Sequence, residues 1–236
     1  MVNGVVCSPG LFLHGDSFEN YASFYGTLFA DPHIPTLTGS DFVHAIESRP
    51  YRSPSRVVGS VWHSDHLFDL NHNIYTQISC VETDLESIYA THFVSRHSLY
   101  CELIKYWHHS LDDVVIELSS FLYPTLLHHA GVEFQLSSGI IKGRFNLIHH
   151  DKYGLPLLMF DPLRYVRFAS ECYTNDQLKL LYNLIRQIVS EIPSEASYVL
   201  KPGDYLRWNN NLVLHRASHR HPLQKRRLLH RVLSFE

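Results

Sequence analysis

Two histidines and one aspartate in this chain have the side-chain types and the spacing of metal ligands. His63 and Asp65 are separated by one residue, and His215 follows a run of β-forming residues far along the chain. Residues i and i+2 of a strand point to the same side, so His63 and Asp65 would converge if Arg56–Phe68 were extended. Two histidines and one carboxylate form the facial triad of non-haem iron(II) oxygenases, which leaves metal positions open. A chelating 2-oxo acid could fill two of those positions and dioxygen a third.

Two arginines close to the C-terminal end could bind an acidic cosubstrate. Arg227 and Arg231 are four residues apart, which on a strand places them on the same face. A guanidinium group is permanently charged and can bind a carboxylate through two parallel hydrogen bonds. We therefore expect a buried arginine of this pair to hold a dicarboxylate such as 2-oxoglutarate.

Each of these patterns also has a simpler explanation when it is taken alone. The chain contains 18 histidines, so one His-x-Asp triplet is only weakly specific for a metal. His219 and His221 are rivals of His215 for the third ligand position. The arginines alone would be typical of a solvated basic segment. The combination is more specific, because order, strand context and spacing agree.

The same residues resemble the motifs of the taurine/2-oxoglutarate dioxygenase family. Trp62-His63-Ser64-Asp65 is similar to its WHxD metal motif. The segment 200–215 resembles the PGD…DN…LH stretch that delivers the distal histidine, and the segment 224–231 resembles the terminal RRxxxR strand. The resemblance covers roughly Val57 to the C-terminus.

This resemblance implies a fold, an activity and a set of site residues. The fold would be a mainly β double-stranded β-helix (jelly roll) with helices. The activity would be that of an Fe(II)- and 2-oxoglutarate-dependent dioxygenase, which uses dioxygen to oxidise a small molecule and releases succinate and CO2. The resemblance implies that iron is bound by His63, Asp65 and His215, and the distal carboxylate of 2-oxoglutarate by Arg227 with Ser87. It places Arg231 near the oxo-acid carboxylate or the substrate.

Hydroxylation is the default outcome, and desaturation would use the same site. Because one arginine suffices for the cosubstrate, we expect the second, Arg231, to bind a carboxylate-bearing substrate such as an amino acid or a derivative of one. The presence of Asp65 disfavours halogenation, which needs an additional open metal position.

The chain departs from the family pattern in three places. The family's GGDT element reads Asp84-Leu85-Glu86-Ser87, and its DN pair lies in a run of three asparagines at 209–211. Gly59 stands where the taurine enzyme has a substrate-binding asparagine, which argues against taurine as the substrate.

Composition is compatible with one Fe(II)/2-oxoglutarate dioxygenase domain over residues 1–236. The chain is 45% hydrophobic and 13% aromatic, enough to bury a barrel. Its formal charge of −3 argues against a nucleic-acid partner. No apolar run has the length of a membrane span, so we expect no membrane partner. The four cysteines lack metal-type spacing and fit a cytoplasmic protein. The sequence leaves open whether the protein forms a homo-oligomer.

Apolar periodicity predicts the elements that would carry these residues. A helix over Asn175–Ile192 has apolar residues at helical spacing, with Asn175 or Asp176 as its cap and Pro193 as its stop. Further expected elements are helices at Gly39–Glu47, Leu99–Trp107 and Leu111–Leu122, and strands within Val57–Val81, Val132–Phe168 and Tyr198–Glu236.

Two other classes of function remain compatible with these residues. One is a metal enzyme of similar fold that does not use 2-oxoglutarate, and which would not need the two arginines. The other is a jelly-roll binding or structural protein with a relic site. Succinate release on addition of iron and 2-oxoglutarate distinguishes both from the predicted enzyme.

Overall fold

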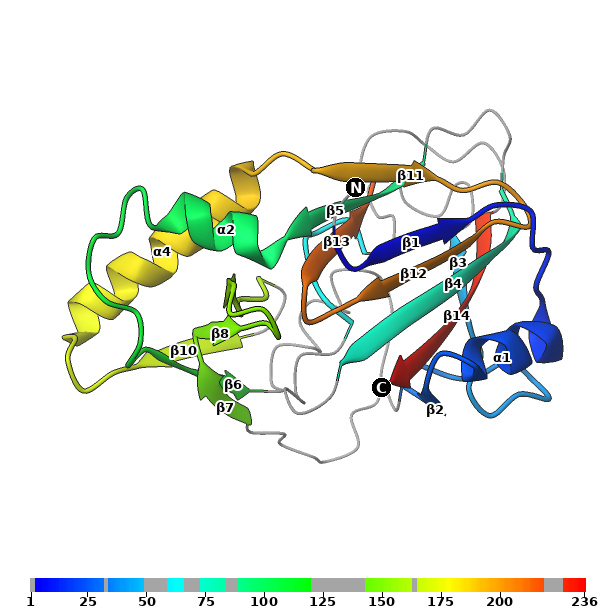
Figure 1. Cartoon of the computed structure of the whole chain (residues 1–236), viewed down its shortest axis with the longest axis horizontal. Coiled ribbons are helices and arrows are strands. Elements are labelled where there is room, and N and C mark those ends of the chain that lie inside the picture. The colour runs from blue at the N-terminus through cyan, green and yellow to red at the C-terminus, as the bar shows by residue number, and fades with distance from the viewer. Residues whose placement is uncertain are drawn as a thin grey trace.

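A six-stranded antiparallel sheet forms the larger half of the barrel (Figure 1). The computed structural model describes residues 3–31, 34–48, 59–65, 73–83, 89–119, 143–162, 165–218 and 227–236. Within these ranges the strand order is β1-β12-β4-β14-β2, and β3 also pairs with β14. The strands are β1 (Val5–Ser8), β2 (Thr27–Phe29), β3 (His44–Ser48), β4 (Ile74–Glu82), β12 (Tyr205–Asn209) and β14 (Arg227–Phe235).

A smaller sheet packs against the larger one. Its described strands run in the order β11-β5-β13, which are β11 (Ala196–Val199), β5 (Ala90–Ser95) and β13 (Val213–Ala217). One apolar cluster joins the sheets: Ile78, Leu206 and Leu229 come from the larger sheet, and Phe93 and Val213 from the smaller. The predicted double-stranded β-helix is therefore confirmed, with its core between the two sheets.

The alternation of side chains along β4 explains how the larger sheet is buried on both faces. Ile78 and Cys80 point into the barrel cluster. Gln77, which precedes Ile78, points to the opposite, outer face, where its Nε2 donates to the carbonyl of Ala22 (3.2 Å) in helix α1 (Gly15–Ser23). Helix α1 covers this outer face through Phe18 and Ala22, which pack in one cluster with residues of β12 and β14.

The remaining described elements gather at the end of the barrel away from α1 (Figure 1). They share a second apolar cluster. They are α2 (Arg96–Leu103), α4 (Asn175–Glu191), the sheet of β10 (Tyr165–Ala169), β6 (Val115–Ser119) and β7 (Gly143–Asn146), and the hairpin of β8 (Ile148–His150) and β9 (Pro156–Leu158).

Helix α4 confirms the predicted helix, with a different cap. Thr174, rather than Asn175 or Asp176, accepts a hydrogen bond from the backbone N–H of Gln177, whose side chain accepts from the N–H of Thr174 in return. At the other end Ile192 is extended, with ψ of 130°, as expected for the residue before a proline.

Two predicted helices are wrong. Within the segment predicted as a helix at Leu111–Leu122, the described residues 115–119 form strand β6, which pairs with both β7 and β10. The segment Gly39–Glu47 instead leads into strand β3, which pairs with β14. In both cases pairing with strands distant in the sequence outweighs the local pattern. Among the described residues, no helix is both long and apolar enough to cross a membrane.

Candidate metal centre

His63 and His215 lie opposite each other on neighbouring chain segments. The two residues form an isolated antiparallel bridge, in which the N–H of each donates to the carbonyl of the other at 2.9 Å. His215 lies in the middle of β13. The predicted strand through Arg56–Phe68 is not found over its described part, residues 59–65, which has no ladder beyond this bridge. Pairing with β13 therefore places His63.

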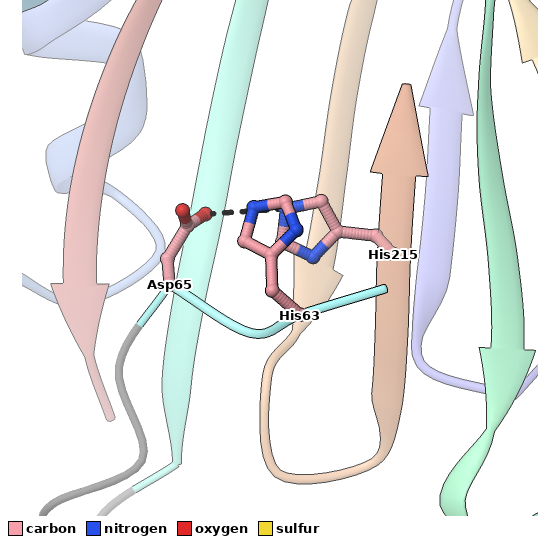
Figure 2. A group of neighbouring side chains, drawn as sticks. All are labelled: His63, Asp65 and His215. Carbon is pink, nitrogen blue, oxygen red and sulfur yellow. Dashed lines mark ion pairs between the residues drawn. The ribbon is translucent and has the colours of Figure 1, made fainter. Parts of the chain in front are cut away.

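The three predicted ligands converge (Figure 2). One nitrogen from each of His63 and His215 and one carboxylate oxygen of Asp65 lie within 4.8 Å of one another. The His215 Nε2 is 3.6 Å from the Asp65 Oδ2, and the two imidazole rings have centroids 4.2 Å apart. Among the described residues this is the only such group of histidine, cysteine or acidic side chains.

Hydrogen bonding and burial leave both imidazoles ready to coordinate a cation. The His63 Nδ1 is 2.7 Å from the carbonyl of Val61, so this nitrogen donates and Nε2 is the ring nitrogen left for a metal. Burial, followed by the neighbouring His63, lowers the pKa of His215 to about 3, so the ring is neutral near pH 7. Gly59 has a φ of +78°, and a Cβ there would lie 3.1 Å from the His63 Cε1. Glycine thus leaves room for the His63 ring.

Asp65 is held as an ionised carboxylate with both oxygens oriented. Burial opposes ionisation, but the Arg231 guanidinium, aided by His215, His63 and the Thr76 hydroxyl, holds the pKa of Asp65 well below its usual range. The Arg231 Nη1 donates to Oδ1 at 2.9 Å, and the Thr76 Oγ1 donates to Oδ2 at 2.5 Å. Oδ2 faces the histidines, so it is the oxygen that could bind a metal.

Thr76 and Asn210 form a network that the sequence patterns did not indicate. The Asn210 Oδ1 accepts from the backbone N–H of Asp65 (3.2 Å) and from the Trp208 Nε1 (3.2 Å). The Asn210 Nδ2 donates to the Thr76 Oγ1 at 2.8 Å. Asn210 thereby fixes both the backbone of Asp65 and the hydroxyl that binds its carboxylate. The only sequence feature noted at this position was the run of three asparagines at 209–211, where the resembled family pattern has its DN pair.

Arg231 lies at the metal centre but is already paired with two carboxylates. Besides Asp65, it donates from Nη2 to the Asp31 Oδ2 at 2.9 Å. Asp31 is only 2% exposed, and its backbone N–H donates to the His44 Nε2 at 3.0 Å. A segment distant in sequence thus supplies a counter-charge to the site. No pattern around Asp31 indicated this contact.

Arg227 has a different environment. It is 5% exposed, and among the described residues its buried Nη2 has no hydrogen-bond partner. Its electrostatic neighbours are the thiol of Cys80 and the phenol of Tyr89, while burial lowers the pKa of Arg227. Burial raises the pKa of Cys80 to about 11 and also raises that of Tyr89, so both groups are neutral. Arg227 is therefore a buried cation without a carboxylate partner among the described residues.

Several candidates from the sequence lie outside the described residues. They are Ser87, His219 and His221; Arg226, the first arginine of the segment that resembles RRxxxR, lies there as well.

The donor set at His63, Asp65 and His215 fits the facial triad that binds non-haem iron(II). It comprises two imidazoles and one ionised carboxylate on one side of a shared space, which leaves further positions for other ligands. Neighbouring polar groups already orient Asp65 and His63, as is usual around metal ligands.

Comparison with solved structures finds the same fold in dioxygenases. No family model and no curated protein matches the chain in sequence. A protein assigned as an alpha-ketoglutarate-dependent taurine dioxygenase from Burkholderia xenovorans matches with a TM-score of 0.69 and 16% identity, over 98% of this chain and 78% of that one. A taurine dioxygenase from the same organism gives 0.67 and 15%, over 98% and 76%.

A third structure carries ligands. It is AAD-2 in complex with Mn(II) and N-oxalylglycine, with a TM-score of 0.68 and 13% identity, over 98% of this chain and 82% of that one. At these identities the comparison establishes the fold, which this chain shares with the two taurine dioxygenases and with AAD-2.

Proposed function

We propose that this protein is an Fe(II)- and 2-oxoglutarate-dependent dioxygenase that oxidises a small molecule. The observation that carries the proposal is the convergence of His63, Asp65 and His215 in a double-stranded β-helix. The buried Arg227, which no described carboxylate neutralises, supports a negatively charged cosubstrate. The overall reaction for hydroxylation is R–H + O2 + 2-oxoglutarate → R–OH + succinate + CO2.

The site residues would have two separate roles, metal binding and cosubstrate binding. His63, Asp65 and His215 would hold iron, which supplies oxygen activation when it is bound. Arg227 would bind the distal carboxylate of 2-oxoglutarate, with Ser87 as the second contact suggested by the family resemblance. Because Cys80 and Tyr89 are neutral, they do not neutralise the charge of Arg227, which is available to bind that carboxylate.

We assign Arg231 to Asp65 rather than to the cosubstrate or the substrate. Its Nη1 and Nη2 groups are directed at Asp65 and Asp31, each at 2.9 Å. The expected carboxylate-bearing substrate relied on Arg231 being available for a further anion, and two carboxylates already neutralise it. We therefore propose a small-molecule substrate without requiring an acidic group on it.

The test is 2-oxoglutarate-dependent succinate formation by the whole chain with Fe(II), ascorbate and dioxygen. Because succinate formation should increase when the primary substrate is bound, a panel of amino acids, amino-acid derivatives and neutral small molecules is screened for stimulation. His63→Ala, Asp65→Ala and His215→Ala should each abolish turnover and weaken Fe(II) binding. Wild-type protein that binds Fe(II) and forms no succinate under any of these conditions would favour the relic-site alternative.

A metal enzyme that does not use 2-oxoglutarate is distinguished by oxygen uptake. Such an enzyme would consume dioxygen with a substrate of the panel whether or not 2-oxoglutarate is present. The proposed enzyme should consume dioxygen only with 2-oxoglutarate, and its Arg227→Gln variant should need a higher 2-oxoglutarate concentration.

A further inference from the structure

We propose that Arg96 and Ser64 are positioning residues for the metal centre, which hold the two ligand-bearing segments in a fixed relation. Neither side chain is a metal ligand. The proposal deepens the proposed function and rests on its metal site alone, not on 2-oxoglutarate.

Arg96 is a fully buried cation whose hydrogen bonds have defined partners. It is 0% exposed and is the first residue of α2. Its Nη1 donates to the carbonyls of Leu158 and Phe160, both at 3.1 Å. Its Nε donates to the carbonyl of Asn210 at 3.2 Å, and its Nη2 donates to the Ser64 Oγ at 2.9 Å. A buried guanidinium is stable only when its donors are paired, so these contacts also fix where their partners lie.

Two of these partners belong to the segments that carry the ligands. Ser64 stands between His63 and Asp65, and Asn210 lies five residues before His215. Arg96 therefore contacts both segments from the N-terminal end of α2. We call these contacts of Arg96 with Ser64 and Asn210 the clamp. Because Asn210 also accepts from the backbone N–H of Asp65, the clamp extends to the carboxylate ligand itself.

Ser64 needs a hydroxyl group to take part in this clamp. Its Oγ accepts from Arg96 and donates to the Asp161 Oδ2 at 3.2 Å. The backbone N–H of Ser64 donates to the same Asp161 oxygen at 3.1 Å. Ser64 and Asp161 are 2% and 0% exposed. A hydroxyl can accept and donate at once, which threonine reproduces and alanine does not.

The clamp matters because backbone pairing fixes only part of the segment that carries His63 and Asp65. Within its described residues, 59–65, the segment belongs to no named strand, and its backbone bonds to β13 are made at Gly59 and His63, not at Asp65. The position of Asp65 therefore depends on side-chain contacts. Groups that orient metal ligands without touching the metal typically change metal affinity or activity by about 10–100-fold when they are removed.

The experiment compares Ser64→Ala, Ser64→Thr and a matched control, Ser234→Ala. Ser234 is also a fully buried serine, whose Oγ accepts from the Gln77 Nε2 at 2.9 Å, and it lies in β14 on the outer side of the sheet. For each whole-chain variant, Co(II) and Mn(II) dissociation constants, the visible absorption of the Co(II) form and the urea unfolding of the metal-free protein are measured.

The expected result is a defect in the metal site that exceeds any loss of stability. Ser64→Ala should weaken Co(II) binding about tenfold or more and alter the Co(II) absorption spectrum. Ser64→Thr should restore both to within about twofold, and Ser234→Ala should leave both unchanged. If Ser64→Ala does not fold, Asp161→Asn is used, which keeps the side-chain volume and should also weaken Co(II) binding and alter the spectrum.

Two outcomes overturn the proposal in distinguishable ways. If the wild type binds Co(II) and Ser64→Ala binds it equally well with the same spectrum, Arg96 and Ser64 only support the packing of α2. The proposed function then stands. If the wild-type protein binds neither metal, the proposed function fails as well, since there is no centre to position.

Discussion

Replacing each of the two buried arginines of β14 by glutamine should affect a different property of the protein. Arg227 and Arg231 are both 5% exposed. Arg231 donates to two carboxylates, whereas the buried Nη2 of Arg227 has no partner among the described residues. We predict that Arg227→Gln impairs cosubstrate binding but not folding, and that Arg231→Gln impairs folding.

The magnitudes follow from what each substitution leaves behind. Arg231→Gln leaves Asp31 and Asp65 buried without their cation, and breaking a buried ion pair in this way costs about 3–5 kcal/mol of stability. Arg227→Gln removes a buried charge that no carboxylate among the described residues neutralises, so the unfolding free energy should change by less than about 2 kcal/mol. Loss of a bidentate contact to the distal carboxylate costs about 2–5 kcal/mol of binding, which is roughly 30-fold to several thousand-fold in affinity.

Stability and cosubstrate affinity are measured on the same protein preparations. Urea unfolding of the metal-free wild type and the two variants gives the stability differences. Calorimetric titration of the Mn(II)-loaded proteins with N-oxalylglycine, an unreactive analogue of 2-oxoglutarate, gives the affinity for the cosubstrate. Mn(II) affinity is measured separately and should be unchanged in Arg227→Gln.

One pattern of results would refute this reasoning. If Arg227→Gln destabilises the protein as much as Arg231→Gln and binds N-oxalylglycine with wild-type affinity, Arg227 is a structural cation. The anchor for the distal carboxylate would then have to be another residue, with Arg226 the first to test.

Three further predictions concern neighbouring groups. Thr76→Val removes the donor to the Asp65 Oδ2 and should weaken Fe(II) binding by about tenfold, measured by competition with a chelator; unchanged affinity would exclude Thr76 from orienting Asp65. Ser87→Ala should raise the apparent KM for 2-oxoglutarate by about fivefold, equivalent to roughly 1 kcal/mol, and if Tyr89→Phe raises it instead, the second contact is the phenol next to Arg227. His215 has a pKa of about 3 when folded and near 6.5 when unfolded, so the unfolded state binds one more proton between these values and His215 destabilises the metal-free protein as the pH falls below about 6.5. In His215→Gln the unfolding free energy should therefore depend less steeply on pH between 6 and 4, by up to about 1.4 kcal/mol per pH unit, and an unaltered slope in urea denaturation would contradict a buried, neutral His215.

Local sequence was sufficient where the deciding interactions are themselves local. Helix α4 could be predicted because its buried residues repeat at helical spacing and its ends are set by Thr174 and Pro193, all within one segment.

Interactions between distant segments could not be read from local patterns. Strand β6 was predicted as a helix, because its pairing with β7 and β10 is not encoded in its own residues. For the same reason His63 is placed by its bridge to His215 rather than by a strand of its own.

For the candidate site, the sequence by itself determined which side chains could act as ligands. The types and order of His63, Asp65 and His215, with two arginines four residues apart, were sufficient to predict a metal site and an anion site. Only the tertiary structure decided the state of those groups. Arg227 and Arg231 have the same side chain and the same burial, yet Asp31, 200 residues away in sequence, neutralises only Arg231. The charge that a buried group presents depends on what lies within a few ångströms of it in space, and separation along the chain does not specify that distance.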